Sequence, residues 1–231
     1  MRHAFLLLAL VVACGAPPAE EGLDTAGPTA AEIVAASAEA YGGASRLEAV
    51  RTLRTVTSWD GDEPVTFDIR RPNLMRTESR STLVFDGERA AKLGPDEPEI
   101  LSAGTWKDFE IDLAFRFPAY FDYPADYLGT DSVGGVVAHE LRVTLPLGTE
   151  VTYSIHPGTF LPLRARTAVT IDGTDYTPEI VFDEFVEVDG LLFPRTYRQG
   201  WTPESAQSAV LQSAEVNPIL EDDHFRIPPG L

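Results

Sequence analysis

From Leu53 onward, the chain consists of short runs in which apolar and polar residues alternate. In the clearest run, Val65, Phe67 and Ile69 are apolar and the residues between them are polar. A period of two places successive side chains on opposite faces of a β-strand. Asp-Gly pairs between such runs are typical of tight hairpins, so the pattern predicts roughly ten or eleven strands in an antiparallel meander. The Asp-Gly pairs stand at 60–61, 86–87, 172–173 and 189–190.

Two short helices are expected before the first strand. Thr29 and Glu32 have the spacing of a capping box, and the alanine-rich segment after them stops near Tyr41. The glycines at 42–43 can take the left-handed conformation that ends a helix. Residues 45–48 repeat the capping-box pattern. A sheet with one apolar face must cover that face, so we expect the sheet to curl towards a barrel whose open side the helices cover.

The segment 106–127 interrupts the alternating pattern with eight aromatic residues. Pro118 and Pro124 prevent one continuous helix. One interpretation is a buried plug that fills the concavity of the sheet, and the other is a lid over a ligand-sized cavity. The three tyrosines of the segment favour the lid, because their hydroxyl groups need water or a polar headgroup nearby. No stretch after residue 28 resembles a linker, so residues 29–231 are expected to form one domain.

The first residues are typical of a secreted protein. The apolar run 4–13 is too short to span a bilayer and follows a basic start, as in a secretory signal. Residues 11–13 resemble the lipobox of bacterial lipoproteins, in which the next residue is a cysteine that receives a diacylglycerol. We therefore expect a signal peptide over 1–13, lipidation at Cys14 and a flexible tether over 14–28. An ordinary signal peptide with a chance cysteine is the alternative.

The charge of the chain restricts its partners. Lys and Arg number 18 against 36 Asp and Glu, which gives a net charge of −18. Binding to nucleic acid depends on Lys and Arg that neutralise phosphates, so no nucleic-acid partner is expected. Anionic lipid surfaces should also repel the chain, so a lipid anchor must hold it at a membrane. In the lipoprotein pathway Gly15 does not signal retention at the inner membrane, which predicts a location at the outer membrane with the protein facing the periplasm.

No pattern in the chain is typical of catalysis or metal binding. Nucleophile-elbow, phosphate-loop and dinucleotide motifs are missing from the sequence. His139 and His156 fall on expected strands and lack the spacing of metal ligands. The run 221–224 could chelate a cation, but a solvated acidic turn explains it better. We expect no catalytic residue, no metal and no cofactor.

The order of the expected elements resembles the LolA/LolB-like outer-membrane lipoprotein-sorting proteins, a superfamily that includes RseB-like sensors. The resemblance covers almost all of residues 29–231. It implies a half-open, strongly curved antiparallel sheet, covered by helices, that encloses a hydrophobic cavity for acyl chains. The lipobox makes this chain resemble a lipid-anchored member. The segments that carry the resemblance are 40–43, 69–76, 85–87, 135–143, 153–163 and 188–194.

The predicted fold is thus mainly β (α+β): a strongly curved antiparallel sheet forming a half-open barrel, covered by N-terminal helices and a helical, aromatic lid. The predicted protein is a lipid-anchored, monomeric envelope protein that binds an acyl chain, a lipid or a lipoprotein without catalysis. The alternative is a structural or sensory envelope lipoprotein with a filled core, which acts through contacts with a protein partner. The cavity candidates are Phe67, Ile69, Leu83, Phe85, Trp106, Phe109, Phe115, Phe117, Tyr120, Phe121, Tyr153 and Ile155.

Overall fold

Every described helix and strand lies after residue 29. The computed structural model describes residues 27–94, 98–171 and 173–231, so the expected signal peptide, Cys14 and nearly all of the expected tether lie outside the described residues. No helix within these ranges has the length and apolar character needed to cross a membrane. The helices are α1 (Ala30–Ala40), α2 (Ala44–Ala49) and α3 (Ala103–Arg116), with the 3-10 turns η1 (Ala119–Phe121), η2 (Pro203–Ser205) and η3 (Asp222–Phe225).

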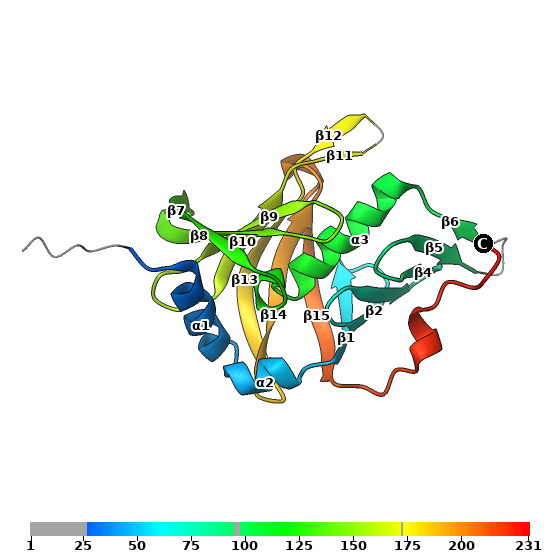
Figure 1. Cartoon of the computed structure of the whole chain (residues 1–231), viewed down its shortest axis with the longest axis horizontal. Coiled ribbons are helices and arrows are strands. Elements are labelled where there is room, and N and C mark those ends of the chain that lie inside the picture. Colours follow the sequence, from blue (N-terminus) through cyan, green and yellow to red (C-terminus); the bar gives the residue numbers. More distant parts are fainter. Residues whose placement is uncertain (1–26, 95–97, 172) are drawn as a thin grey trace, which may run out of the picture.

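Strands make up most of the fold (Figure 1). In the described part of the chain, thirteen strands form one sheet in the order β6-β5-β4-β3-β2-β1-β15-β14-β13-β10-β9-β8-β7, and β11 and β12 form a separate hairpin. The strands are β1 (Thr52–Trp59), β2 (Val65–Arg70), β3 (Leu74–Glu78), β4 (Thr82–Phe85), β5 (Ala90–Leu93), β6 (Glu99–Ile100), β7 (Ala125–Val133), β8 (Val136–Thr144), β9 (Glu150–Ile155), β10 (Pro162–Thr167), β11 (Val169–Ile171), β12 (Thr174–Tyr176), β13 (Glu179–Val188), β14 (Leu191–Gly200) and β15 (Gln207–Val216).

The large sheet consists of two antiparallel meanders that meet at β1. Strand β1 pairs with β2 on one side, where Leu53 lies opposite Ile69. On its other side β1 pairs with β15, where Leu53 lies opposite Val216. The first and last strands of the chain therefore lie together in the middle of the sheet. In Figure 1, β13, β14 and β15 run from top to bottom whereas β4 and β5 run across the view, because twist accumulates over many strands.

The mainly β, antiparallel class is confirmed, but the sheet is neither closed nor strongly curled. The end strands β6 and β7 each pair with one neighbour only among the described strands. The expected half-open barrel therefore differs from the structure. Strong curling is not needed to cover the apolar face, because α3 lies against it (Figure 1). More strands are present than expected. Strands β6, β11 and β12 are too brief to show a period, and the nine-residue β7 was not expected because its second half, 129–132, contains no large apolar residue.

The capping box predicted for the first helix is confirmed, and the capping box predicted for the second helix is wrong. The Thr29 Oγ1 accepts a hydrogen bond from the Glu32 N–H at 3.2 Å, and the Glu32 Oε2 accepts one from the Thr29 N–H at 2.8 Å. Gly42 and Gly43 end α1 with φ angles of 121° and 105°. No side chain caps α2, so the capping box expected at Ser45 does not form. Gly43 both follows α1 and serves as the N-cap of α2, which leaves no room for a separate cap at Ser45.

The Asp-Gly turns also behave largely as predicted. Asp189 and Gly190 join β13 to β14 with φ angles of 53° and 77°, the positive values that a type I′ hairpin needs. Residues 86–87 lie in the turn between β4 and β5. The turn between β11 and β12 includes Gly173, but Asp172 lies outside the described residues. Local turn chemistry therefore sets several strand ends.

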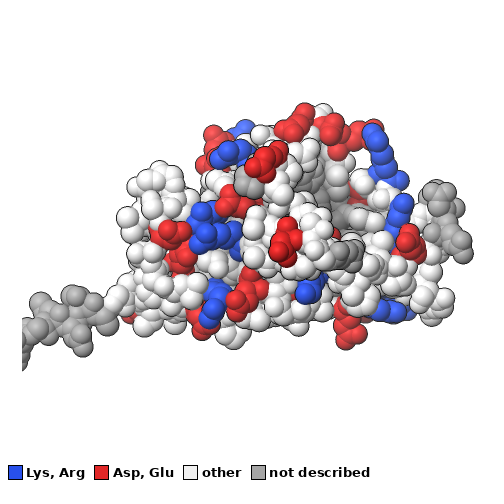
Figure 2. All heavy atoms as spheres, turned by 90° about the horizontal axis from the view of Figure 1, so that it is seen from above, with Lys and Arg blue, Asp and Glu red and all other residues white. Residues whose placement is uncertain are grey.

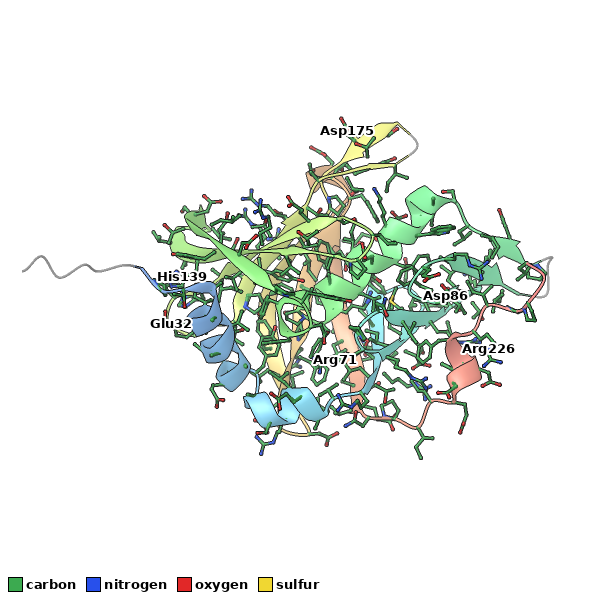
Figure 3. All side chains as sticks on the ribbon, viewed as in Figure 1. Glu32, Arg71, Asp86, His139, Asp175 and Arg226 are labelled. Atoms are coloured by element: carbon green, nitrogen blue, oxygen red, sulfur yellow. The ribbon has the colours of Figure 1, made fainter. Side chains whose placement is uncertain are left out.

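The helix α3 packs between two hydrophobic clusters. One cluster is formed mainly by β8, β9, β10 and β13, and the other mainly by α2 and β1 to β5. Figure 3 shows side chains filling the space between α3 and the sheet. From α3, the first cluster receives Ile111, Ala114 and Phe115, and the second receives Phe109 and Leu113, together with Phe117 just after the helix. Burial on two sides makes α3 the element that joins the two halves of the core.

The acidic run 221–224 has partners in the fold. The His224 Nε2 lies 2.6 Å from the Asp68 Oδ2. The same carboxylate accepts two hydrogen bonds from Arg54, at 2.6 and 2.8 Å. Because Asp68 alternates with the inward-facing residues of β2, these bonds hold η3 on the face of the sheet opposite α3. The acidic residues 221–223 are exposed, as expected of a solvated turn, whereas His224 docks on the sheet. No group of three His, Cys, Asp or Glu able to hold a metal is found in the described residues.

Candidate functional site

A groove runs between α3 and the part of the sheet formed by β1 to β4. Its cavity volume is about 570 Å³. Ligand sites in proteins span roughly 300–1,000 Å³ and are lined mainly by apolar side chains, so this groove has the size and the character of a ligand site. Its large apolar lining residues are Trp59, Val65, Phe67, Met75, Leu83, Phe109, Ile111, Phe115 and Trp201.

The periods of the surrounding elements place these side chains. On β2, Val65 and Phe67 are two residues apart and face the same side of the sheet. On α3, the residues Asp108, Asp112 and Phe115 recur at intervals of four and three and thus form one stripe along the helix. The groove is therefore the seam between one strand face and one helix stripe.

Arg116 lies deep in this seam. Its guanidinium carbon is 3.1 Å from the centre of the Phe67 ring and 5.5 Å from the Trp59 ring. Its Nε donates to the Asp112 Oδ2 at 3.0 Å, and only 7% of the Arg116 side chain is exposed. Burial lowers the pKa of Arg116, but the negative charge of Asp112 and the contact with Tyr197 outweigh this effect and raise the pKa overall. The guanidinium therefore remains charged, with Asp112 hydrogen-bonded to its edge and the Phe67 ring packed against its face.

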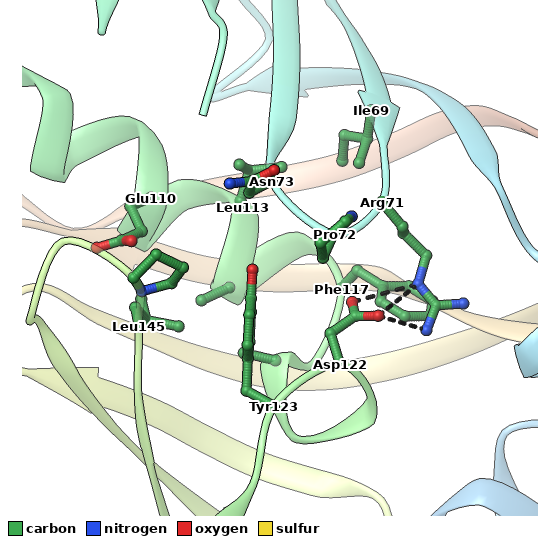
Figure 4. Close-up of a pocket in the computed structure, with 13 residues that line it drawn as sticks. Ile69, Arg71, Pro72, Asn73, Glu110, Leu113, Phe117, Asp122, Tyr123 and Leu145 are labelled. Atoms are coloured by element: carbon green, nitrogen blue, oxygen red, sulfur yellow. Dashed lines mark hydrogen bonds and ion pairs between the residues drawn. The ribbon is translucent and has the colours of Figure 1, made fainter. Parts of the chain in front are cut away.

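A second, much smaller pocket of about 20 Å³ lies on the other side of α3 (Figure 4). It contains the ion pair between Arg71 and Asp122, whose closest atoms are 2.8 Å apart. The Arg71 guanidinium also lies 4.5 Å from the centre of the Phe117 ring. Glu110 lines the same pocket and accepts a hydrogen bond from the Leu147 N–H at 2.7 Å. Burial raises the pKa of Glu110, and this pocket has room for little more than a water molecule.

A third hollow of about 630 Å³ is polar. Its lining includes Glu150, Glu179, Arg166 and Arg198, and several threonines stand between them. Val181 is its largest apolar side chain. An apolar ligand would bury little hydrocarbon there, so the groove beside α3 is the stronger candidate for an amphiphile.

Two of the three tyrosines of the aromatic segment have polar partners inside the protein. The Tyr120 hydroxyl lies 3.0 Å from the Ser37 Oγ of α1. The Tyr127 hydroxyl lies 3.3 Å from the Nδ1 of His139. Burial raises the pKa of Tyr123 to about 12. These partners remove the reason for expecting a ligand headgroup at Tyr120 and Tyr127, so most of the aromatic segment belongs to the core.

The twelve predicted cavity residues fall into three sets. Those that line the groove are Phe67, Leu83, Phe109 and Phe115. Those that line the small pocket are Ile69 and Phe117. Those that pack within or against the hydrophobic clusters without lining either cavity are Phe85, Trp106, Tyr120, Phe121, Tyr153 and Ile155. The sequence therefore identified apolar inward-facing positions, and tertiary packing divides them between core and groove.

Sequence reasoning missed several groove residues. Arg116 is the most consequential, and its only sequence signal is an acidic residue four positions earlier on an expected helix, at Asp112. Trp59 ends strand β1, and Trp201 follows strand β14. These two strands are not paired with each other in the sheet. Nothing in their local sequence indicates that they share one groove.

Basic side chains on the surface stand beside acidic ones. On the face seen in Figure 2, Lys and Arg stand in small groups beside Asp and Glu rather than in one broad basic patch. Arg164, for example, pairs with Asp131 at 3.1 Å and with Glu140 at 3.5 Å. Such paired cations are already neutralised by protein carboxylates.

No family model matches the chain. No curated protein matches it either. Several solved structures share the fold. A structure described as an outer-membrane lipoprotein-sorting protein domain from Vibrio parahaemolyticus is 9% identical, with a TM-score of 0.53 over 84% of this chain and 94% of that one.

Two other structures agree with that match. A LolA superfamily protein from Nitrosomonas europaea is 13% identical, with a TM-score of 0.52 over 87% of this chain and 99% of that one. A DUF1329 family protein from Desulfovibrio piger is 11% identical, with a TM-score of 0.51 over 84% of this chain and 97% of that one. The protein thus has a fold of the LolA-like class, and the predicted resemblance is confirmed at the level of the fold.

Proposed function

We propose that this protein is a lipid-anchored, non-catalytic envelope protein that holds an acyl chain or a similar amphiphile in the groove between α3 and β1 to β4. The observation that carries the proposal is an apolar groove of about 570 Å³ in a LolA-like fold. Hydrocarbon transferred from water into such a groove contributes roughly 25 cal/mol per Å² of apolar surface buried. Residues 29–231 would act as one domain, with residues 14–28 as its tether.

The second candidate is a structural or sensory envelope protein. It is favoured by the burial of α3 on two sides and by the internal partners of Tyr120 and Tyr127. In that case the groove would stay empty and the exposed loops would contact a protein. The two candidates differ in one measurable property, which is uptake of a lipid probe by the isolated protein.

The first prediction concerns the groove. Residues 15–231, which keep every described helix and strand, should bind a pyrene-labelled monoacylglycerol in a fluorescence titration. Leu83→Trp should weaken this binding at least tenfold, or by about 1.4 kcal/mol, because the larger ring fills the groove. The unfolding midpoint of the variant should be measured beside the titration, so that lost binding is not mistaken for lost folding.

A matched control is Val137→Trp. Val137 is 62% exposed on β8 and does not line the groove, so this substitution adds the same ring without blocking the site. Equal binding by the wild-type chain, Leu83→Trp and Val137→Trp would mean that the probe binds outside the groove. Failure of the wild-type chain to bind any acyl probe would overturn the proposal and favour the structural or sensory candidate.

The second prediction concerns the anchor at Cys14. Cys14→Ser should prevent incorporation of radiolabelled palmitate, because the hydroxyl cannot replace the thiol as lipid acceptor. Each buried methylene contributes about 0.8 kcal/mol to membrane attachment, and stable anchoring takes more than one chain. The wild-type protein should therefore be labelled and should fractionate with the outer membrane. Recovery of unlabelled wild-type protein in the soluble periplasmic fraction would contradict both the anchor and the proposed location.

A further inference from the structure

The charges in the groove limit what kind of headgroup it can accept. Among the described residues that line it, the charged side chains are Asp108, Asp112 and Arg116. They comprise two carboxylates and one guanidinium, so the lining carries a net negative charge. The chain as a whole has a net charge of −18, which adds to the negative potential at the site.

The single cation of this lining is already occupied. The Arg116 Nε donates to Asp112 at 3.0 Å, and the guanidinium face lies 3.1 Å from the centre of the Phe67 ring. The other Asp112 carboxylate oxygen accepts a hydrogen bond from the Gln199 Nε2 at 3.1 Å. Because only 7% of the Arg116 side chain is exposed, an anionic headgroup has little access to the other guanidinium N–H groups and would have to share the cation with Asp112.

The remaining polar lining is uncharged. It consists of the hydroxyl and amide side chains of Ser79, Thr105, Gln199 and Ser205, which already hydrogen-bond within the protein, and of Thr77 and Gln207. Hydroxyl and amide groups can donate to an ester or amide carbonyl and accept from a hydroxyl, without the desolvation cost of burying a charge. The polar rim of the groove therefore suits a neutral headgroup.

We propose that the groove selects uncharged acyl compounds, such as an acyl chain ending in a glycerol ester or an amide, over free fatty acids. This inference rests on the proposed acyl-binding function and adds the charge of the headgroup. Two effects act together. Arg116 is engaged by Asp112 and is not offered to the carboxylate of a ligand, and the negative charge of Asp108 repels that carboxylate.

The test compares two ligands with the same chain. Monooleoylglycerol and oleate compete with the pyrene-labelled monoacylglycerol for residues 15–231 at pH 8, below the concentration at which either ligand forms micelles. Monooleoylglycerol should bind at least about tenfold more tightly than oleate. The ratio should shrink as sodium chloride rises from about 10 to about 500 mM, because the screening length shortens with salt and the repulsion of oleate weakens.

Two substitutions locate the effect. Asp108→Asn should strengthen oleate binding severalfold and so narrow the ratio between the two ligands. Asp175→Asn removes the same charge on β12, at the hairpin tip that projects from the molecule in Figure 3, and should leave the ratio unchanged. The salt dependence is measured on the wild-type chain and stands even if Asp108→Asn does not fold.

The outcomes separate this inference from the function on which it rests. Equal or tighter binding of oleate in the wild-type chain, with monooleoylglycerol still bound, overturns the charge selectivity and leaves acyl binding intact. Loss of binding for both ligands overturns acyl binding and the selectivity with it. A ratio that does not respond to salt and to Asp108→Asn also contradicts the inference, because the preference would then have another cause.

Discussion

Replacing Gly42 by alanine is expected to lower the free energy of unfolding by about 2–6 kcal/mol. The φ angle of Gly42 is 121°, and holding an alanine there costs about 1–3 kcal/mol. A Cβ at this position would also overlap the carbonyl oxygen of Gly190 in the β13–β14 turn, and relieving such an overlap costs about 1–3 kcal/mol more. Urea unfolding of both proteins measures the difference.

Gly43→Ala is the matched control. Gly43 has a similar φ angle of 105°, but its nearest neighbour to a new Cβ is the Glu39 Oε2 at 3.9 Å. This variant should show the conformational cost alone. The difference between the two variants therefore reports the approach of α1 to the β13–β14 turn, where the Tyr41 carbonyl also accepts a hydrogen bond from the Leu192 N–H at 3.0 Å. Equal losses in the two variants would argue against that close approach.

Phe117→Ala is expected to cost about 3–5 kcal/mol of stability, the usual loss for a buried phenylalanine. The Phe117 side chain is 8% exposed, lies 5.8 Å from Phe121 between ring centres, and stacks under the Arg71 guanidinium. It does not line the groove, so binding of the pyrene-labelled monoacylglycerol should be retained under conditions in which the variant is folded. Unfolding in urea and a titration at low temperature measure the two quantities.

This experiment separates the two interpretations of the aromatic segment. A lid would lose probe uptake on Phe117→Ala and lose little stability, which is the reverse of the result expected from the packing. Val137→Ala serves as the control for stability, because Val137 is 62% exposed and surface substitutions usually change the free energy of unfolding by less than about 0.5 kcal/mol.

Some parts of the candidate site could be predicted from the sequence. Phe67 and Leu83 were identified because alternation along a strand shows which residues share a face. Phe109 and Phe115 were identified because they belong to a dense run of aromatics. Arg116 was not, because its place under the Phe67 ring depends on how a helix late in the chain crosses a strand formed much earlier.

The sequence by itself determined the features that depend on neighbouring residues. These are the antiparallel strand class, the Thr29 capping box, the glycine end of α1 and the Asp-Gly turn at 189–190. Side-chain period, helix caps and turn conformations all act over a few residues, so their signals are contained in short stretches of the chain.

Only the tertiary structure decided how these pieces combine. It paired β1 with β15, left the sheet open and placed α3 across the apolar face, where it divides the inward-facing side chains between core and groove. The same cause underlies all three results. An apolar strand face can be covered by curling of the sheet or by a helix with almost equal loss of exposed hydrocarbon, and the alternating pattern is identical in both cases. The choice depends on contacts between residues far apart in the chain, which no local pattern records.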